Sequence, residues 1–298
     1  MFIKRNNIYL SYILLICTFL IWGSLYIVSK VALKDIPPFT LLMLRYVFSV
    51  IILGIISWRR GFIRIKKEHL KYFLFIGGIG YFGAIAFQLI GTRLIPASTS
   101  ALVNSLNPVT IPICAAIFLH EKITFRKVIC TLISLFGVYI ILSSKEHHIS
   151  YLGILSGLIS VSLWSITAIV IRKIGNHYGS IQLALYGMCI SLIFAIPASC
   201  IEICLTPWRL TSTAIISALY MAIVCTALAQ TLWNKCLINL EASKCSMFYP
   251  LQTLFSAILG IIFLREVITS NFIIGAILIS LGIMLSVYNF PNANIKRL

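Results

Sequence analysis

Two asparagines and a proline interrupt an apolar stretch of this sequence, and they are suited to binding a solute. Asn104, Asn107 and Pro108 lie within the run from Ala97 to Glu121. Their spacing of three and four places them on one face of a helix. A proline removes an intrahelical hydrogen bond, and amides are costly in hydrocarbon unless they meet partners or water. This face is therefore predicted to line a protein interior or a cavity.

Arg45 is the most informative charge, because it lies about two helical turns inside an apolar stretch. Charges at such a depth usually face a bundle interior or an aqueous cavity. Two interpretations are open for Arg45: structural pairing with the nearby Asp35, or contact with a substrate. Trp22 and Tyr26 form one helical stripe that Lys30 continues, which suits either core packing or the wall of a transport cavity. In a cavity, Lys30 and Arg45 would attract a substrate carboxylate.

Further polar and aromatic residues lie in apolar surroundings later in the chain. Gln88 and Gln230 could each join helices or bind substrate, and both interpretations are open. Trp164 repeats the tryptophan of the first stripe, and Tyr249 and Gln252 share a polar helix face. The candidate substrate-binding residues are Trp22, Tyr26, Lys30, Arg45, Gln88, Asn104, Asn107, Trp164, Gln230, Tyr249 and Gln252, and the candidate gating residues are Pro108 and Pro250.

Patterns typical of catalysis or metal binding are weak or missing. The run from Gly78 to Gly83 fits GxGxxG, but it lies inside an apolar span, where close helix packing is the better interpretation. HExxH and GxSxG are absent, so neither an enzyme nor a cofactor is expected. None of the seven acidic residues lies at mid-span, which argues against a proton-coupling carboxylate. Glu266, at a helix end, is expected to pair with Arg265.

Membrane spans are the elements that must position these residues. Hydrophobic residues make up 60% of the 298 residues and charged residues 10%, whereas a soluble domain has about 25% charged residues. At about 20 residues per span, ten helices are predicted. Their ranges are 9–29, 39–58, 71–91, 97–119, 126–143, 151–171, 181–202, 212–233, 243–264 and 272–288.

The basic residues set the orientation of these spans. Seventeen of the 24 Lys and Arg residues lie on the side of the N-terminus, six lie on the other side, and Arg45 lies within a span. This positive-inside bias predicts a multi-pass protein of the cell (inner) membrane with both termini cytoplasmic. The formal net charge of +17 is explained in the same way, so no nucleic-acid partner is expected.

An internal repeat appears when residues are compared at a fixed offset of 142, which becomes 145 in the later part. Matched residues are Trp22 with Trp164, Lys30 with Arg172, Gln88 with Gln230, and Glu121 with Glu266. Repeats at 1–145 and 146–298 would hold five spans each, and because five is odd the second copy would be inverted. The predicted fold is an all-α integral membrane protein with ten transmembrane helices as two inverted five-helix repeats.

These motifs together resemble the EamA-type carriers of the drug/metabolite transporter superfamily along the whole chain. The resemblance rests on the WGS run that begins at Trp22, on Arg45, on NPV…FLHE from Asn107 to Glu121, and on LQT…FLRE from Leu251 to Glu266. It implies a central cavity formed by spans one, three, four, six, eight and nine, with the fifth span of each repeat at the periphery. It also implies export of amino acids or related small metabolites.

Two further expectations accompany this resemblance. Pro250 lies three residues earlier in the second repeat than Pro108 does in the first, so the two helix kinks should differ in depth. The expected surroundings are a small-molecule substrate and the lipid bilayer, with the chain a monomer or a weak homodimer. The alternative from another class of function is a membrane scaffold or regulatory subunit that transports nothing.

Overall fold

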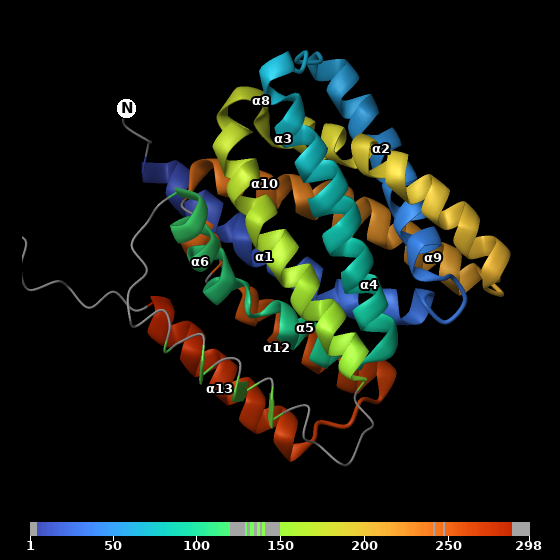
Figure 1. Cartoon of the computed structure of the whole chain (residues 1–298), viewed down its shortest axis with the longest axis vertical. Helices are drawn as coiled ribbons and strands as arrows, with labels where there is room; N and C mark the ends of the chain where they lie inside the picture. The colour runs from blue at the N-terminus through green and yellow to red at the C-terminus, as the bar shows by residue number, and fades with distance from the viewer. Residues whose placement is uncertain are drawn as a thin grey trace, which may run out of the picture.

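The computed structural model describes residues 5–119, 150–240, 242–246 and 248–287, together with seven positions between 129 and 140. Every regular element in this part of the chain is a helix (Figure 1). This is the expected outcome for so apolar a sequence, because a backbone that crosses hydrocarbon must satisfy its own hydrogen bonds. The predicted span 126–143 lies mostly outside the described residues, as do Glu121 and both chain ends.

The first half of the chain forms three long helices and one broken helix. These elements are α1 (Arg5–Ala32), α2 (Pro38–Arg60), the continuous run of η1 (Lys67–His69), α3 (Leu70–Leu74), η2 (Phe75–Ala84) and α4 (Ile85–Leu94), and then α5 (Ala97–Asn104) and α6 (Asn107–Leu119). Pro38 lies in the first turn of α2, where its missing N–H costs no intrahelical bond. The segment η2 is π-helical, a wide form of helix that is frequent at functional sites.

The second half of the chain has the same kinds of element. These are α8 (Tyr151–Leu205), the continuous run of α9 (Ser212–Tyr220), η3 (Met221–Leu228) and α10 (Ala229–Asn239), then α11 (Ala242–Ser246), α12 (Tyr249–Leu259), η4 (Gly260–Leu264) and α13 (Ser270–Val287). The 55 residues of α8 cover two predicted spans, and the helix breaks at Gly179, where φ is 73°. Glycine adopts this conformation without the steric cost that a Cβ would bring. In Figure 1 the two halves of α8 diverge from this break, close to α3.

Two apolar stretches predicted as single spans are interrupted. Span four breaks between α5 and α6, and span nine breaks between α11 and α12. Pro108 and Pro250 are each the second residue of the helix that follows the break. At the repeat offset of 145, α12 begins three residues earlier than α6. The breaks therefore differ in depth by three residues, or about 4.5 Å of helix, as the shifted proline predicts.

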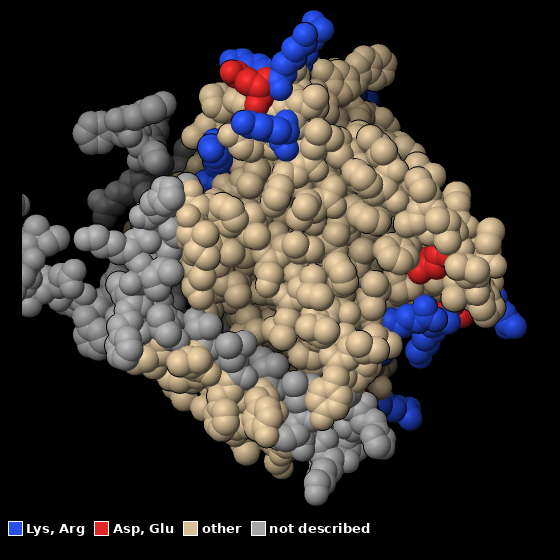
Figure 2. Space-filling view, viewed as in Figure 1, with Lys and Arg blue, Asp and Glu red and all other residues tan. Residues whose placement is uncertain are grey.

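The outer surface suits a bilayer. Five helices of the described residues are long and apolar enough to cross a membrane, and large apolar side chains such as Trp58 and Leu205 are 76% and 77% exposed. Figure 2 shows charged side chains at two ends of the visible face with an uncharged surface between them. Figure 1 shows α13 at the edge of the bundle, where Phe272 and Ile279 pack near α6. This edge position agrees with the peripheral fifth span that the resemblance implied.

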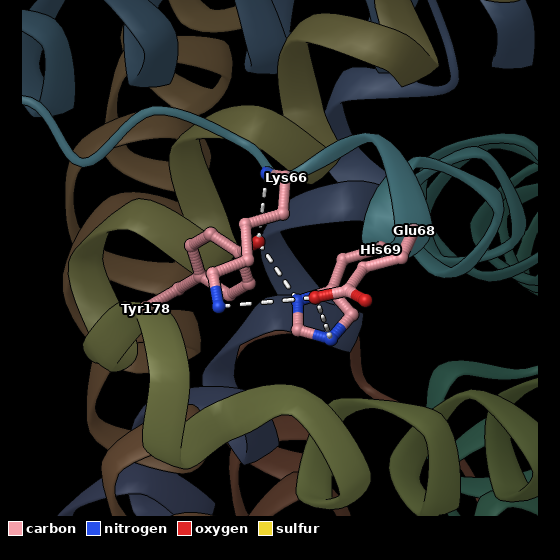
Figure 3. Close-up of polar contacts among 4 residues, drawn as sticks. All are labelled: Lys66, Glu68, His69 and Tyr178. Atoms are coloured by element: carbon pink, nitrogen blue, oxygen red, sulfur yellow. Dashed lines mark hydrogen bonds and ion pairs between the residues drawn. The ribbon is translucent and has the colours of Figure 1, made fainter.

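A small polar cluster holds the connection between α2 and α3 against the break in α8. The Tyr178 hydroxyl accepts a hydrogen bond from the backbone N–H of Lys66 (3.1 Å) and lies 2.9 Å from His69 Nδ1 (Figure 3). Glu68 Oε1 is 3.8 Å from Lys66 Nζ and 3.9 Å from His69 Nε2. Because the Lys66 and Glu68 side chains are exposed, these ion pairs add little stability. The buried Tyr178 instead fixes the loop beside Gly179.

Candidate binding cavity

A cavity of about 30 Å³ lies at the centre of the bundle, which is room for about two water molecules, so a larger solute could enter only if the surrounding helices moved apart. Helices α1, α2, α4, α5, α8, α10 and α12 line it through Trp22, Leu25, Tyr26, Arg45, Ile85, Gln88, Asn104, Ser160, Trp164, Gln230, Tyr249 and Gln252. None of these residues is more than 9% exposed, so the lining side chains are buried within the bundle. The resemblance implied six spans around such a cavity, and the structure adds α2 through Arg45.

Nine of the eleven candidate binding residues line this cavity. The two that do not are Lys30 and Asn107. Sequence reasoning missed Leu25, Ile85 and Ser160, which lie three or four residues from Trp22, Gln88 and Trp164 and therefore share their helix faces. Extending each predicted face by one helical turn would have found all three.

Two tryptophans at repeat-related positions form part of the wall. The rings of Trp22 and Trp164 meet edge to face, with centroids 6.1 Å apart and an interplanar angle of 79°. Trp22 Nε1 donates to the Cys225 carbonyl (3.1 Å), and Trp164 Nε1 donates to the Tyr249 hydroxyl (2.8 Å). Because both indole N–H groups are bonded, the rings are fixed in place and present apolar surface to the cavity.

Amides from two helices converge on Tyr26. Its hydroxyl accepts a hydrogen bond from Gln88 Nε2 of α4 (2.7 Å) and another from Gln252 Nε2 of α12 (3.2 Å). Gln230 Nε2 donates to Asn234 Oδ1 within α10 (3.1 Å). The two interpretations of Gln88 are thus compatible, since this side chain joins helices and also lines the cavity.

Arg45 is 3% exposed and lines the cavity. Its Nε donates to the Thr226 hydroxyl, which in turn donates to the Met221 carbonyl five residues earlier in η3 (2.7 Å). The wide π-helical turn of η3 allows this i to i−5 contact and so aims the hydroxyl at α2. Arg45 Nη1 has no hydrogen-bond partner among the described residues. Nε of the guanidinium is therefore held by Thr226, while Nη1 has an N–H donor that is open to a bound ligand.

The suggested pairing of Arg45 with Asp35 is wrong. Asp35 Oδ2 accepts from the Thr211 hydroxyl (2.6 Å), and its carbonyl accepts from Arg209 N (2.9 Å). These bonds tie the end of α1 to the start of α9. The two ion pairs found among the described residues both involve Glu68, so no described carboxylate lies within 4.0 Å of Arg45.

The break between α5 and α6 is stabilised by a side chain that replaces a missing donor. Pro108 has no N–H to donate to the Asn104 carbonyl four residues earlier. Asn107 Nδ2 donates to that carbonyl instead (2.8 Å), and Asn107 Oδ1 accepts from the Ser165 hydroxyl of α8 (3.1 Å). Asn107 thus supports the break, while Asn104 lines the cavity.

Lys30 belongs to α1, and its side chain lies away from the cavity and reaches the C-terminal end of α4. Its Nζ donates to the carbonyls of Thr92 (2.9 Å), Arg93 (3.0 Å) and Ile95 (2.7 Å). An ammonium has three N–H donors, and here each has an acceptor. Lys30 therefore stabilises carbonyls that a helix end leaves without intrahelical partners.

The expected pairing of Glu266 with Arg265 is also wrong. The Glu266 carboxylate accepts from Ala97 N (2.6 Å), Ser98 N (3.2 Å) and the Ser98 hydroxyl (2.5 Å). It caps the N-terminus of α5, where a negative charge is favoured by the helix dipole. A Cβ at Gly260 would lie 2.7 Å from Glu266 Oε2, so glycine leaves room for this carboxylate.

Comparison with known proteins identifies the family. The pattern of the EamA-like transporter family matches residues 9–143 and again 151–288. The chain belongs to the EamA-like transporter family. Membership of this family and the apolar helices make the chain a multi-pass membrane protein.

Relatives of this EamA-family chain are similar over almost its whole length. The uncharacterized transporter YoaV of Bacillus subtilis is 26% identical, over 93% of this chain and 96% of its own. A probable amino-acid metabolite efflux pump of Escherichia coli is 25% identical over 93% and 94%. A solved crystal structure with 18% identity covers 93% of this chain and 96% of its own with a TM-score of 0.68, which supports the fold alone.

Proposed function

We propose that this protein is a secondary transporter that exports amino acids or related small amphiphilic metabolites across the cell (inner) membrane. The observation that carries the proposal is the central cavity, whose buried lining mixes aromatic rings, amides and one cation. Small-molecule sites typically combine such an apolar wall with a few polar groups. In a scaffold that transports nothing, buried polar groups would serve only to join helices, whereas Arg45 Nη1 in this lining has no partner among the described residues, which favours a binding site.

The proposed architecture is ten transmembrane helices arranged as two inverted five-helix repeats, 1–145 and 146–298. Its support is the double family match, the π-helical segments η2 and η3 at matching places, and the broken helices α5–α6 and α11–α12. Seven residues of the cavity lining come from the first repeat and five from the second. Transport would then proceed by alternating access, with the two halves rocking around the cavity.

The orientation and partners proposed for the protein follow from the same plan. Both termini would be cytoplasmic, because the basic residues favour that side. The substrate is a small molecule, and the protein works in the bilayer as a monomer or weak homodimer. The E. coli relative, named a probable amino-acid metabolite efflux pump, supports amino-acid-related compounds as the substrate class.

Counterflow in proteoliposomes tests the transport proposal. Vesicles loaded with unlabelled amino acids or related metabolites should accumulate the same radiolabelled compound transiently. Trp22→Ala and Asn104→Ala should reduce this accumulation, whereas Trp58→Ala, which changes an exposed tryptophan, should not. Unchanged counterflow in both cavity variants would remove these residues from the site. Absence of counterflow for every compound, with no substrate-dependent thermal shift, would contradict transport itself.

A further inference from the structure

The cavity contains a buried positive charge that the described protein atoms do not neutralise. Arg45 is 3% exposed, and its Nη1 has no hydrogen-bond partner among the described residues. An unpaired buried charge costs several kcal/mol, and a charge inside a membrane span marks a functional site by default. A ligand bound in the cavity can supply the missing partner.

The described acidic residues all have other positions and partners. Asp35 binds Thr211, and Glu202 accepts from the backbone N–H (2.8 Å) and hydroxyl (3.0 Å) of Thr40. Glu266 caps α5, and Glu68 belongs to the exposed cluster of Figure 3. None of the residues found to line the cavity is acidic. The lining therefore offers a cation and neutral groups, but no counter-charge for a substrate ammonium.

A second free donor lies in the same wall. Asn104 Nδ2 is buried and has no partner among the described residues, while Asn104 Oδ1 faces the Asn107 amide (3.3 Å). Asn104 Nδ2 and Arg45 Nη1 are both N–H donors. A ligand that forms hydrogen bonds with them must therefore offer acceptor atoms. A carboxylate offers two acceptor oxygens and one negative charge. The rings of Trp22 and Trp164 leave the rest of the wall apolar.

We infer that the cavity selects small organic anions, whose carboxylate binds Arg45 and whose apolar body packs against Trp22 and Trp164, over zwitterionic amino acids. This inference rests on the proposed transport function and narrows its substrate class to amino-acid-related carboxylic acids without a free ammonium. An anion leaves the loaded cavity neutral. A zwitterion leaves one net positive charge buried, because amide and hydroxyl groups can accept from an ammonium but cannot cancel its charge.

Three ligands that share one body test the charge preference. Binding of 3-phenylpropanoate, phenylalanine and 2-phenylethylamine to the purified full chain in detergent can be measured by titration calorimetry at pH 7.5. We expect 3-phenylpropanoate to bind at least tenfold more tightly than phenylalanine, and the amine to show no measurable binding. Equal affinities, or a preference for phenylalanine or the amine, would overturn the inference.

Variants at Arg45 test whether the guanidinium carries this preference. Arg45→Met should lose at least tenfold in affinity for 3-phenylpropanoate while the protein unfolds at the same or a higher temperature, because an unpaired buried charge has been removed. Arg45→Lys should retain part of the preference for the anion. Arg59→Met, which removes an exposed charge, is the matched control and should change neither quantity. Unchanged affinity in Arg45→Met would overturn the inference.

The transport assay separates failure of this inference from failure of the proposed function. Counterflow of zwitterionic amino acids without binding of 3-phenylpropanoate would leave a transporter and reject the anion preference. Absence of both counterflow and binding would reject the transporter and, with it, the inference.

Discussion

Lys30 and Arg172, 142 residues apart at matching places in the two halves of the chain, make matching contacts. Lys30 Nζ donates to the Ile95 carbonyl (2.7 Å), and Arg172 Nη1 donates to the Leu240 carbonyl (2.9 Å). Ile95 and Leu240 each precede the first part of a broken helix, α5 or α11. A cation from one helix thus fixes the corner where another helix ends, in both halves. This correspondence supports the proposed repeat.

Lys30 should therefore contribute to stability rather than to substrate affinity. Lys30→Met should lower the thermal unfolding temperature in detergent, because three carbonyls at the end of α4 lose their donor. Arg172→Met should produce a smaller decrease, since one contact is lost. The KM for export should stay within twofold of the parent value in both variants. A large rise in KM for Lys30→Met with unchanged stability would show that Lys30 acts on the substrate instead.

Asn107 and Pro108 should be energetically coupled. Asn107→Ala leaves the buried Asn104 carbonyl without a donor, which costs about 1–3 kcal/mol. In a Pro108→Ala background the restored backbone N–H can bond that carbonyl, so the same Asn107→Ala change should cost much less. A double-mutant cycle measured by thermal unfolding tests this coupling. Additive effects of the two changes would mean that Asn107 does not replace the proline's missing donor.

Glu266 should stabilise α5 through its charge. Glu266→Gln keeps the shape of the cap but removes the charge, and it should cost about 0.5–2 kcal/mol. Gly260→Ala should also destabilise, because its Cβ would displace the carboxylate. Glu68→Gln, in an exposed cluster, is the control and should have little effect on the unfolding temperature. If Glu266→Gln matched this control, the cap would have no energetic role.

Gly179 should tolerate a side chain poorly for backbone reasons, because its φ is positive. Its φ of 73° and ψ of 165° lie in a region that only glycine adopts readily and would cost an L-residue about 1–3 kcal/mol, so Gly179→Ala should lower the unfolding temperature. Gly54 lies inside α2 with open space around the position of a Cβ, and Gly54→Ala should raise stability slightly. Equal responses to the two substitutions would show that the break in α8 does not depend on glycine.

The sequence predicted much of the cavity because helical periodicity fixes which residues share a face. Polar or aromatic residues inside apolar spans, such as Arg45 and Gln88, had to face inwards, and the structure places them around one space. The contacts of Lys30 and Glu266 could not be predicted in this way. Each reaches a helix end more than 60 residues away in the chain, so it depends on how helices pack.

Some local features also lay beyond the reach of the sequence pattern. The π-helical turns of η2 and η3 have the same apolar composition as α-helix, so composition does not distinguish them. The role of Asn107 depended on where the helix breaks, because only then does its side chain turn back towards the Asn104 carbonyl.

The uncompensated charge of Arg45 has a consequence for the energy source of export. If each cycle carries one organic anion outwards, the inside-negative membrane voltage drives the cycle, because the loaded cavity is neutral and the empty cavity turns inwards with the positive charge of Arg45. A potential of 100 mV supplies about 2.3 kcal/mol per elementary charge, enough for roughly a fifty-fold concentration ratio. Such a uniporter would require no coupling ion and no mid-membrane carboxylate to carry a proton.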